Sequence, residues 1–180
     1  MCVRCGALLP EPPDRDLIRG VDSVRAMTIY DSFAKDLVWR LKFQGARAAA
    51  RTMARHMVPL VEWDANSVIV PIPTATRRVR QRGFDQAHLI SWHLAKFTGL
   101  RASNCLRRHG QTHQIGASRE QRLSQLESSF TIRKKTDLSG RGIILVDDVV
   151  TTGATIEAAA SVIRTAGPRR LDALVFAQAD

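Results

Sequence analysis

The sequence predicts an α/β fold in which helices cover an open, largely parallel β-sheet. Two short runs rich in β-branched residues, SVIVPIP and GIILVDD, are each followed by a polar loop and then by a segment with helical periodicity. Successive strand, loop and helix units of this kind pair their strands in parallel. With 180 residues, of which 44% are hydrophobic, the chain is long enough for one domain with a sizeable core.

The first third of the chain is expected to contain one strand and two helices. Residues 23–30 alternate weakly between apolar and polar side chains, which favours a strand. Asp31 or Ser32 is suited to cap a helix that ends near Phe43. A second helix, rich in Ala, Met and Arg, is expected over 46–60 with one face buried.

The middle of the chain predicts one strand, loop and helix unit. SVIVPIP, at 67–73, reads as a buried parallel strand because its apolar run ends in two prolines. A basic loop follows at 74–83, and residues 84–99 form the next helix with Gly99 as its C-terminal cap. The apolar face of that helix is expected to consist of Ala87, Ile90, Leu94 and Phe97.

A second unit follows after a long polar stretch. Residues 106–129 are basic and only weakly periodic, so we expect a mobile excursion that carries a short helix and lies outside the core. A strand from Ile143 to Asp147 then precedes a helix that begins near Ala154. The final strand, at 171–179, completes the alternation.

The charge balance favours partners that carry phosphate groups. The chain has 27 Lys and Arg residues against 17 Asp and Glu, which gives a formal net charge of +10. The planar Arg fork is suited to bidentate contacts with phosphate. Aromatic residues make up only 6% of the chain, so base stacking on single-stranded nucleic acid has little support from composition.

The sequence also bears on the compartment. No run approaches the roughly 18 consecutive apolar residues of a membrane span, so we expect no membrane insertion. The start, MCVRCGALLPEPPDRD, lacks the order of charged and apolar regions in a signal peptide. We therefore expect a cytoplasmic protein.

Three cysteines raise the question of zinc. Cys2 and Cys5 have the CxxC spacing of a zinc knuckle, but a structural zinc site needs four ligands. The other candidate ligands, Cys105, His109 and His113, lie far along the chain. An odd number of cysteines without an export signal also argues against a disulfide framework. We expect no zinc bound within this chain.

The strongest functional signal is a pair of carboxylates near the C-terminus. Asp147 and Asp148 follow an apolar strand, and ligands of open α/β sheets lie beyond the carboxyl ends of the strands. The turn from Thr151 to Thr155 offers backbone N–H groups, hydroxyls and a helix N-terminus, which suit a phosphate monoester. The carboxylates would repel that phosphate unless they face hydroxyls or a cation. A sugar phosphate with Mg²⁺ meets both conditions; the alternative is a structural network at the strand end.

These residues carry a family resemblance. VDDVVTTGAT resembles the phosphoribosyl-diphosphate loop of the type I phosphoribosyltransferases. Four segments resemble, in the order in which they occur, those of the ComF family associated with bacterial competence. They are this loop and, before it, LKFQGA at 41–46, VIVPIPTATRRVRQRGFDQA at 68–87 and QIGASREQR at 114–122. The resemblance covers roughly residues 23–180.

The resemblance implies roles for individual residues. Asp147 and Asp148 would be the catalytic pair that holds the ribose hydroxyls and the Mg²⁺, and residues 106–129 would close over the site as a flexible loop. The 5-phosphate would be wrapped by Thr151, Thr152, Gly153, Ala154 and Thr155. The leaving diphosphate would be neutralised by Arg77, Arg78, Arg80 and Arg82. Four cations in six residues are also typical of a solvated face or a nonspecific nucleic-acid patch.

The chain departs from the family pattern at several positions. ComF proteins usually carry two CxxC knuckles, so residues 1–20 are interpreted as the remnant of a zinc-ribbon-like segment with a linker, ahead of a phosphoribosyltransferase-like domain over 21–180. The family's RGFNQ appears as RGFDQ, which puts the carboxylate of Asp85 beside the expected anion site. Gln125 replaces a usual Asn.

The resemblance implies a protein that binds phosphoribosyl diphosphate with Mg²⁺ and is associated with DNA uptake, and it leaves two classes of function open. One is an enzyme that transfers the phosphoribosyl group, with a phosphoribosyltransferase of nucleotide metabolism as an alternative. Its acceptor would not be a purine, because purine-salvage relatives have a carboxylate where this chain has Thr151, and Thr is no general base at neutral pH. The other is a non-catalytic module that senses phosphoribosyl diphosphate while its basic surface binds single-stranded DNA or a competence helicase.

Overall fold

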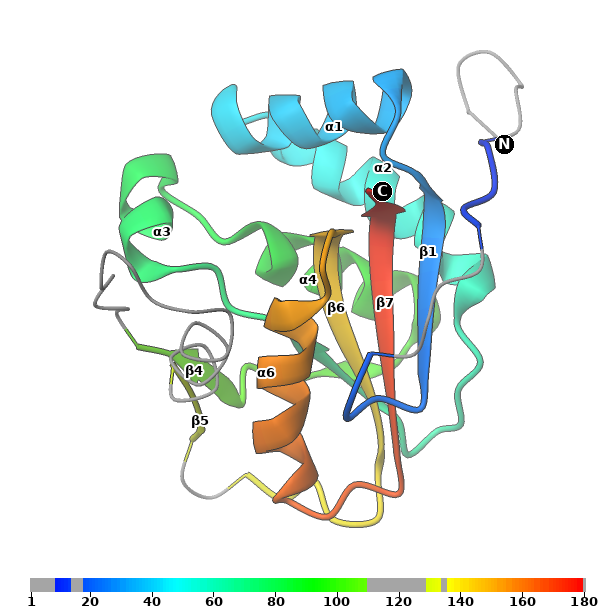
Figure 1. Ribbon diagram of the computed structural model, residues 1–180, viewed down its shortest axis with the longest axis vertical. Coiled ribbons are helices and arrows are strands. Elements are labelled where there is room, and N and C mark those ends of the chain that lie inside the picture. Colours follow the sequence, from blue (N-terminus) through cyan, green and yellow to red (C-terminus); the bar gives the residue numbers. More distant parts are fainter. Residues whose placement is uncertain (1–8, 14–17, 110–128, 134–135, 180) are drawn as a thin grey trace.

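The structure is a computed structural model that describes residues 9–13, 18–109, 129–133 and 136–179. Its centre is a five-stranded sheet in the order β1 (Ser23–Ile29), β7 (Arg170–Gln178), β6 (Gly142–Val150), β2 (Val68–Pro71) and β3 (Arg101–Ala102). All four strand pairs are parallel. The expected α/β fold with a parallel sheet is therefore confirmed (Figure 1).

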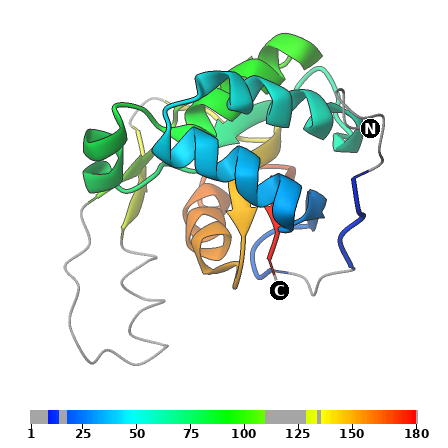
Figure 2. The same ribbon diagram turned by 90° about the horizontal axis from the view of Figure 1, so that it is seen from above.

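Helices cover both faces of this sheet (Figure 2). One face carries α1 (Ser32–Phe43), α2 (Arg47–Met57) and α4 (Gln86–Thr98), while α6 (Ala154–Arg164) lies on the other. Because successive strand residues point to opposite faces, β6 supplies both cores. Ile144 packs with the helices of the first face and Leu145 packs with α6.

The ends of several helices follow the signals in the sequence. Asp31 caps α1 by accepting a hydrogen bond from the backbone N–H of Ala34. Gly99 ends α4 in the left-handed conformation, with φ of 76°. The helix expected over 46–60 is α2 followed by a 3₁₀ turn at Val58–Leu60, where a proline interrupts the regular pattern. Phe97, expected on the buried face of α4, is 38% exposed instead.

The expected basic loop at 74–83 is wrong in most of its length. Residues Thr76–Arg82 form the short helix α3, which Gly83 ends with φ of 77°. Arg and Gln are good helix formers, and a glycine at this position is a usual C-terminal stop. The dense positive charge of this segment is typical of a loop and obscured these two helix signals.

The excursion expected over 106–129 begins as part of the core. Strands β4 (Leu106–Arg108) and β5 (Phe130–Ile132) pair in antiparallel fashion. Leu106 and Phe130 are both buried in the cluster that includes α6. Residues 110–128, on which the expectations of a short helix and of a flexible loop mainly rest, lie outside the described residues.

Residues that precede the first strand also pack on the sheet. Pro10 accepts a hydrogen bond from the Thr28 hydroxyl through its carbonyl oxygen at 2.9 Å, and Leu9 is buried. Ile18 and Val21 belong to the core cluster on the α6 side. Across the described ranges, no helix combines the length and apolar character needed to cross a bilayer.

Candidate functional site

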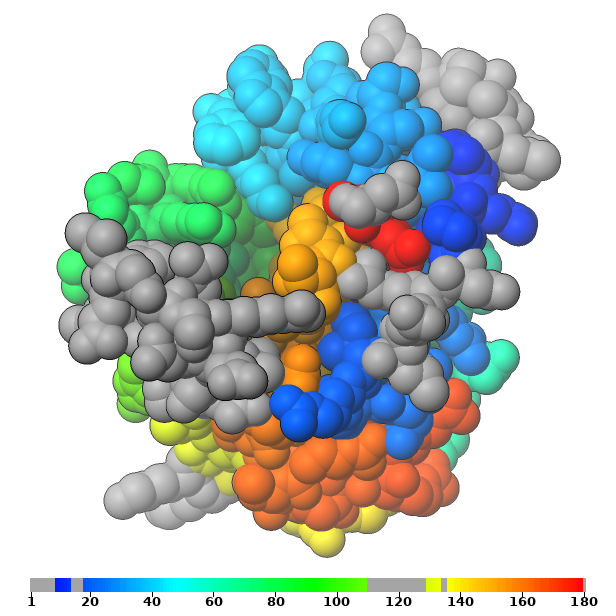
Figure 3. Space-filling view, viewed as in Figure 1, coloured from blue at the N-terminus to red at the C-terminus, as the bar shows by residue number. Residues whose placement is uncertain are grey.

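A cleft of about 290 Å³ lies at the carboxyl end of β6. It opens where the end of β6 and the turn before α6 reach the surface, between α1 and α3 (Figure 3). Six of its lining residues are ones that the sequence predicts for the site. They are Asp147, Asp148, Thr151, Thr155, Arg78 and Arg82. The cleft thus joins the two segments that the sequence predicts to bind a sugar phosphate.

The acidic pair lies within β6 rather than beyond its end. The strand continues to Val150, and Asp147 is in register with Val175 of β7. Asp148 is 7% exposed, and its backbone N–H donates to the Asp147 carboxylate at 2.8 Å. The expected strand end at Asp147 is therefore three residues short, because β6 continues past both carboxylates to Val150.

Electrostatics distinguish the two carboxyl groups. Burial, and then the neighbouring charge of Asp148, raise the pKa of Asp147 to about 8. Asp148 instead faces a cation, since Lys42 Nζ lies 2.7 Å from its Oδ2. An arriving cation would favour the ionised form of Asp147, because an opposite charge offsets the cost of burial. The pair can therefore accept sugar hydroxyls or contact a hard cation.

The turn that precedes α6 presents backbone and hydroxyl donors. Gly153 adopts φ of 81°, and the helix begins at Ala154. Thr151 and Thr155 are among the residues that line the cleft, and the Thr152 hydroxyl accepts from the Ala154 N–H at 3.4 Å. Backbone N–H groups at the start of a helix attract negative charge. The structure thus brings the Thr/Gly turn and the acidic pair to one cleft.

The four predicted arginines separate into two faces of α3. Arg78 and Arg82, four residues apart, line the cleft. Arg77 and Arg80 line a different surface hollow together with Thr76 and Gln81. This separation follows from the helix, because residues at i and i+4 share a face while their neighbours point elsewhere. The expectation that all four arginines face one anion depended on a loop, and this segment is a helix instead.

Asp85 is engaged by backbone groups next to the cleft. Its carboxylate accepts from the Thr74 N–H at 2.8 Å and from the His88 N–H at 3.2 Å. It is the N-cap of α4, a position for which aspartate is well suited. The departure from RGFNQ therefore keeps a capping residue, and joins the turn after β2 to α4.

Sequence reasoning missed five polar residues that line the cleft. They are Tyr30, Lys42, Thr74, Gln86 and Arg108. Lys42 and Gln86 fall within segments that carry the family resemblance, which was the available signal. Arg108 was assigned to a mobile excursion, but it lies on β4 with its guanidinium carbon 5.2 Å from the centre of the Phe130 ring.

The donor set fits a magnesium ion shared with a ligand. Carboxylate oxygens are ligands that Mg²⁺ prefers, and protein sites often supply one or two of them while phosphates and waters complete the shell. Among the residues that the structure describes, no group of three or more His, Cys, Asp or Glu is arranged to hold a metal. Asp147 and Asp148 are therefore suited to an ion that arrives with a phosphorylated ligand.

The candidate zinc ligands are placed unequally. Cys105 is 1% exposed in the core, where burial raises the pKa of its thiol. His109 lies with Nε2 2.7 Å from the Thr131 hydroxyl. Cys2, Cys5 and His113 lie outside the described residues. The Cys105 thiol is thus part of the packing beneath β4, and a buried neutral thiol is a poor metal ligand.

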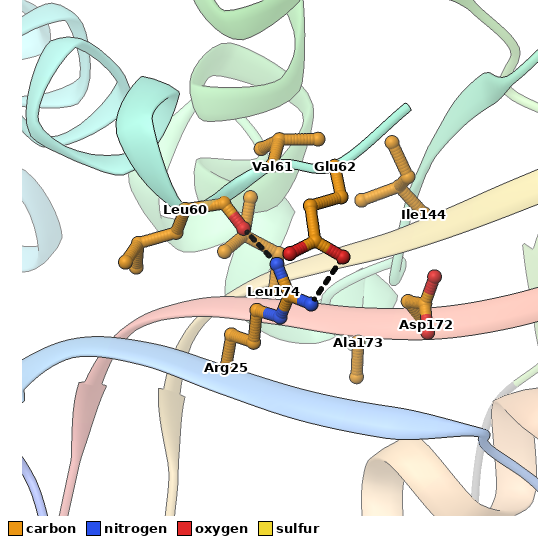
Figure 4. A pocket seen from close by; sticks show the side chains of 8 residues that line it. All are labelled: Arg25, Leu60, Val61, Glu62, Ile144, Asp172, Ala173 and Leu174. Atoms are coloured by element: carbon orange, nitrogen blue, oxygen red, sulfur yellow. Dashed lines mark hydrogen bonds and ion pairs between the residues drawn. The ribbon is translucent and has the colours of Figure 1, made fainter. Parts of the chain in front are cut away.

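Two further cavities lie at the opposite end of the sheet. The smaller, about 10 Å³, has room for a single water, and Arg25 beside it donates to the Leu60 carbonyl at 2.8 Å and to Glu62 at 2.9 Å (Figure 4). The larger, about 250 Å³, is lined by charges that include the ion pair of Arg169 with Asp64. Ligands of this architecture bind at the carboxyl ends, so these cavities read as structural.

Comparison with known proteins identifies this architecture as that of the phosphoribosyl transferase domain family. Residues 49–179 match the phosphoribosyl transferase domain family. A solved structure, the glutamine phosphoribosylpyrophosphate amidotransferase of B. subtilis, superposes on 72% of the chain and 26% of its own length with a TM-score of 0.51. Its sequence identity is 15%, so this likeness concerns the fold alone.

Sequence relatives are more specific. Competence protein F of Haemophilus influenzae is 30% identical over 154 residues, which cover 79% of this chain and 67% of that protein. Competence protein ComFC of Bacillus subtilis is 32% identical over 139 residues, covering 76% and 55% respectively. The DNA utilization protein YhgH of Salmonella typhi is 29% identical over 163 residues, covering 84% and 67%. The chain thus spans about half to two thirds of these relatives.

Proposed function

The chain belongs to the phosphoribosyl transferase domain family and is a ComF-type member of it, and from this premise we propose that its cleft binds phosphoribosyl diphosphate together with Mg²⁺. The observation that carries the proposal is the joining of the acidic pair, the Thr/Gly turn and two arginines in one cleft. A ligand with vicinal hydroxyls, a phosphate and a diphosphate matches these three groups of side chains in turn.

Each part of this ligand has a complementary surface. The 5-phosphate would lie on the turn from Thr151 to Thr155, where α6 begins. The ribose hydroxyls would donate to Asp147, whose ionisation a bound cation favours. The diphosphate would face the cations of α3, Arg78 and Arg82, and the end of α1 at Lys42.

The same arrangement supports transfer of the phosphoribosyl group. The bond between the ribose C1 and the diphosphate oxygen breaks, and the diphosphate leaves with its electron pair. An acceptor nitrogen or oxygen donates the electron pair of the new bond to C1 and releases its proton to solvent. Arg78 and Arg82 would stabilise the charge that develops on the departing diphosphate. Bound Mg²⁺ would add Lewis-acid neutralisation of the same charge.

The acceptor is a base or amine other than a purine. Thr151 lines the cleft at the position where purine-salvage relatives place a carboxylate, and its hydroxyl cannot serve as a base at neutral pH. Calorimetry of phosphoribosyl diphosphate in the presence of magnesium tests the binding. Diphosphate release across a panel of bases and amines tests the transfer. No binding would refute the proposal, and binding without release on any acceptor would favour a sensing role.

A second candidate function is the binding of single-stranded DNA beside the cleft. It is favoured by the exposed aromatic pair Trp39 and Phe43 on α1, with ring centres 6.2 Å apart. The Arg82 guanidinium lies 5.4 Å from the centre of the Phe43 ring. Exposed aromatic rings beside cations can stack bases and neutralise phosphates. The relatives named for competence and DNA utilization agree with this candidate.

A further inference from the structure

Two hydrogen-bond donors in the cleft have no partner among the described residues. They are Nε2 of Gln86 and Nε of Arg108, and each atom is buried. Both residues line the cleft beside the acidic pair. Leaving a buried donor unsatisfied is costly, and native structures place a partner at the great majority of such groups. A ligand that fills the cleft would supply one.

Gln86 is the stronger of the two observations. It is 2% exposed and occupies the first turn of α4. Its Oε1 accepts from the Thr74 hydroxyl at 3.1 Å, and Thr74 is itself held by Asp85 through its backbone N–H at 2.8 Å. The Thr74 hydroxyl, which also lies 3.3 Å from the Asp85 carboxylate, is thus shared between Asp85 and the amide oxygen of Gln86. The amide nitrogen is the atom of Gln86 that is buried without a partner.

Arg108 reaches the cleft from a different element. Its guanidinium carbon lies 5.2 Å from the centre of the Phe130 ring, and Nη1 donates to the Pro73 carbonyl at 3.4 Å. Burial is the main cause that lowers the pKa of this guanidinium, but an arginine remains charged at physiological pH. The side chain is therefore a fixed cation that shares the turn after β2 with Gln86, because Thr74 and Pro73 are adjacent.

The corner of the cleft formed by Gln86 and Arg108 presents donors and positive charge next to the carboxylates of Asp85 and Asp147. Gln86 and Arg108 present donors, and Arg78 and Arg82 add positive charge from α3. A ligand group that satisfies them has to be rich in acceptors and negatively charged. The phosphate turn before α6 is a separate element of the same cleft, so an anion at this corner is distinct from one on that turn. A diphosphate offers more acceptor oxygens and more negative charge to donors on α3, α4 and β4 than a single phosphate does.

We propose that Gln86 and Arg108 bind the diphosphate of the ligand and determine its preference over ligands that carry only the 5-phosphate. The inference rests on the proposed function in that it assigns one end of the same ligand. Gln86 contributes neutral donors that hold an oxygen without adding charge. Arg108 contributes a charged donor from the strand that precedes residues 110–128.

The test compares three ligands by calorimetry with magnesium present: phosphoribosyl diphosphate, inorganic diphosphate and ribose 5-phosphate. Gln86→Met keeps the size of the side chain and removes both donors. We expect it to lower the affinity for phosphoribosyl diphosphate and for inorganic diphosphate about tenfold, which is the usual effect of losing one hydrogen bond to a charged group. The affinity for ribose 5-phosphate should stay unchanged. Gln86→Glu should weaken the two diphosphate ligands further, since it adds a negative charge.

A matched control and a second variant complete the experiment. Gln81→Met changes the same side chain on the outward hollow beside α3 and should leave all three affinities as they are. Arg108→Met repeats the test from β4, so the inference can still fail if Gln86→Met does not fold. Diphosphate affinities that are unaffected in the folded variants would overturn the inference and leave the proposed function standing.

The unmodified protein separates the two hypotheses. If the protein binds inorganic diphosphate through Gln86 but does not bind phosphoribosyl diphosphate, the diphosphate role of Gln86 and Arg108 is supported and the proposed function is refuted. Failure to bind either diphosphate ligand would overturn both. Equal losses for ribose 5-phosphate and for inorganic diphosphate would also overturn the inference, because they would show that the substitution disturbs the whole cleft.

Discussion

The ammonium group of Lys42 lies 2.7 Å from the Asp148 carboxylate, at the point where the last turn of α1 meets β6. The side chains are 24% and 9% exposed, so the pair is largely withdrawn from water. Removing one partner of such a pair leaves an uncompensated charge. The contact therefore ties the covering helix α1 to the candidate site.

Replacing Lys42 by Met should destabilise the ligand-free protein. We expect a loss of about 1 to 3 kcal/mol in the free energy of unfolding, less than for a fully buried pair because Lys42 keeps some exposure. In an Asp148→Asn background the same substitution should cost much less, since the carboxylate is already neutral. Urea denaturation of the four proteins measures the coupling, and equal costs in both backgrounds would contradict it.

The raised pKa of Asp147 predicts a pH dependence of stability. Its value of about 8 exceeds the ordinary 3.8, so the folded state binds a proton that the unfolded state has lost between these values. Stability is then highest at the acid end for this group and falls as the pH rises through about 8. Asp147→Asn does not titrate and should therefore gain in melting temperature relative to the parent protein as the pH rises.

Melting curves without metal or ligand, recorded between about pH 5 and pH 9, test this dependence. Asp137→Asn, which replaces an exposed carboxylate, is the matched control. A constant difference between Asp147→Asn and the parent across this interval would contradict the assignment. The same variant should lose affinity for phosphoribosyl diphosphate, because an amide cannot carry the charge that a cation requires.

The Thr/Gly turn before α6 depends on packing beneath it. A Cβ added at Gly153 would lie 2.5 Å from Cδ1 of Ile18, and the backbone there has φ of 81°. Gly153→Ala should therefore lose stability for two reasons, of which the left-handed backbone alone costs about 1 to 2 kcal/mol. Gly99→Ala has the same left-handed backbone, with φ of 76°, but no atom lies within 4 Å of the added Cβ. It therefore measures the cost of the backbone conformation alone.

We expect Gly153→Ala to be more destabilised than Gly99→Ala, and Ile18→Ala to recover part of the difference. Ribose 5-phosphate binding should fall in Gly153→Ala and stay unchanged in Gly99→Ala, since only the first alters the turn. Thermal unfolding and calorimetry measure both effects. Equal destabilisation of the two glycine variants would mean that the Ile18 side chain moves aside without cost.

Binding of single-stranded DNA, if the aromatic pair on α1 contributes, has a distinct signature. Affinity should be independent of sequence and fall steeply with salt, because counterion release supplies much of it. Trp39→Ala with Phe43→Ala should weaken binding by about 1 to 3 kcal/mol per stacked base. Trp92→Ala on α4, where the ring is 45% exposed and faces Lys96, is the control. Fluorescence anisotropy with unrelated oligonucleotides would expose sequence preference or salt insensitivity, either of which contradicts the expectation.

The sequence predicted the sheet and the acidic pair because their signals are local. The apolar strand of Ile143 to Asp147 and the Thr/Gly turn after it are adjacent in the chain, and their periodicity needs no knowledge of the rest. Partners brought from a distance were not predictable in this way. Lys42 and Asp148 are 106 positions apart in the sequence, and only the packing of α1 on the sheet brings them together.

The arginines illustrate a different limit. A dense basic segment was interpreted as a loop, and a loop gives no reason to separate its side chains. Once Thr76–Arg82 is a helix, the 3.6-residue period separates Arg78 and Arg82 from Arg77 and Arg80. The short element could be predicted only from the combination of helix-forming residues and Gly83, which are weak signals when taken alone.

This separation gives a final prediction with an internal control. Arg78→Met with Arg82→Met and Arg77→Met with Arg80→Met each remove two positive charges from the same helix. If the cations act as a diffuse field, both double variants should weaken phosphoribosyl diphosphate equally. If direct contacts in the cleft matter, the first pair should lose at least about tenfold more affinity, because charge-assisted hydrogen bonds to phosphate fall off once contact is lost. The affinity for ribose 5-phosphate should be much less affected by either pair of substitutions, since this ligand has no diphosphate.

Calorimetry at two salt concentrations separates the two cases, because screening weakens a diffuse field more than it weakens contacts within the cleft. Equal losses that vanish together at high salt would remove α3 from the binding site.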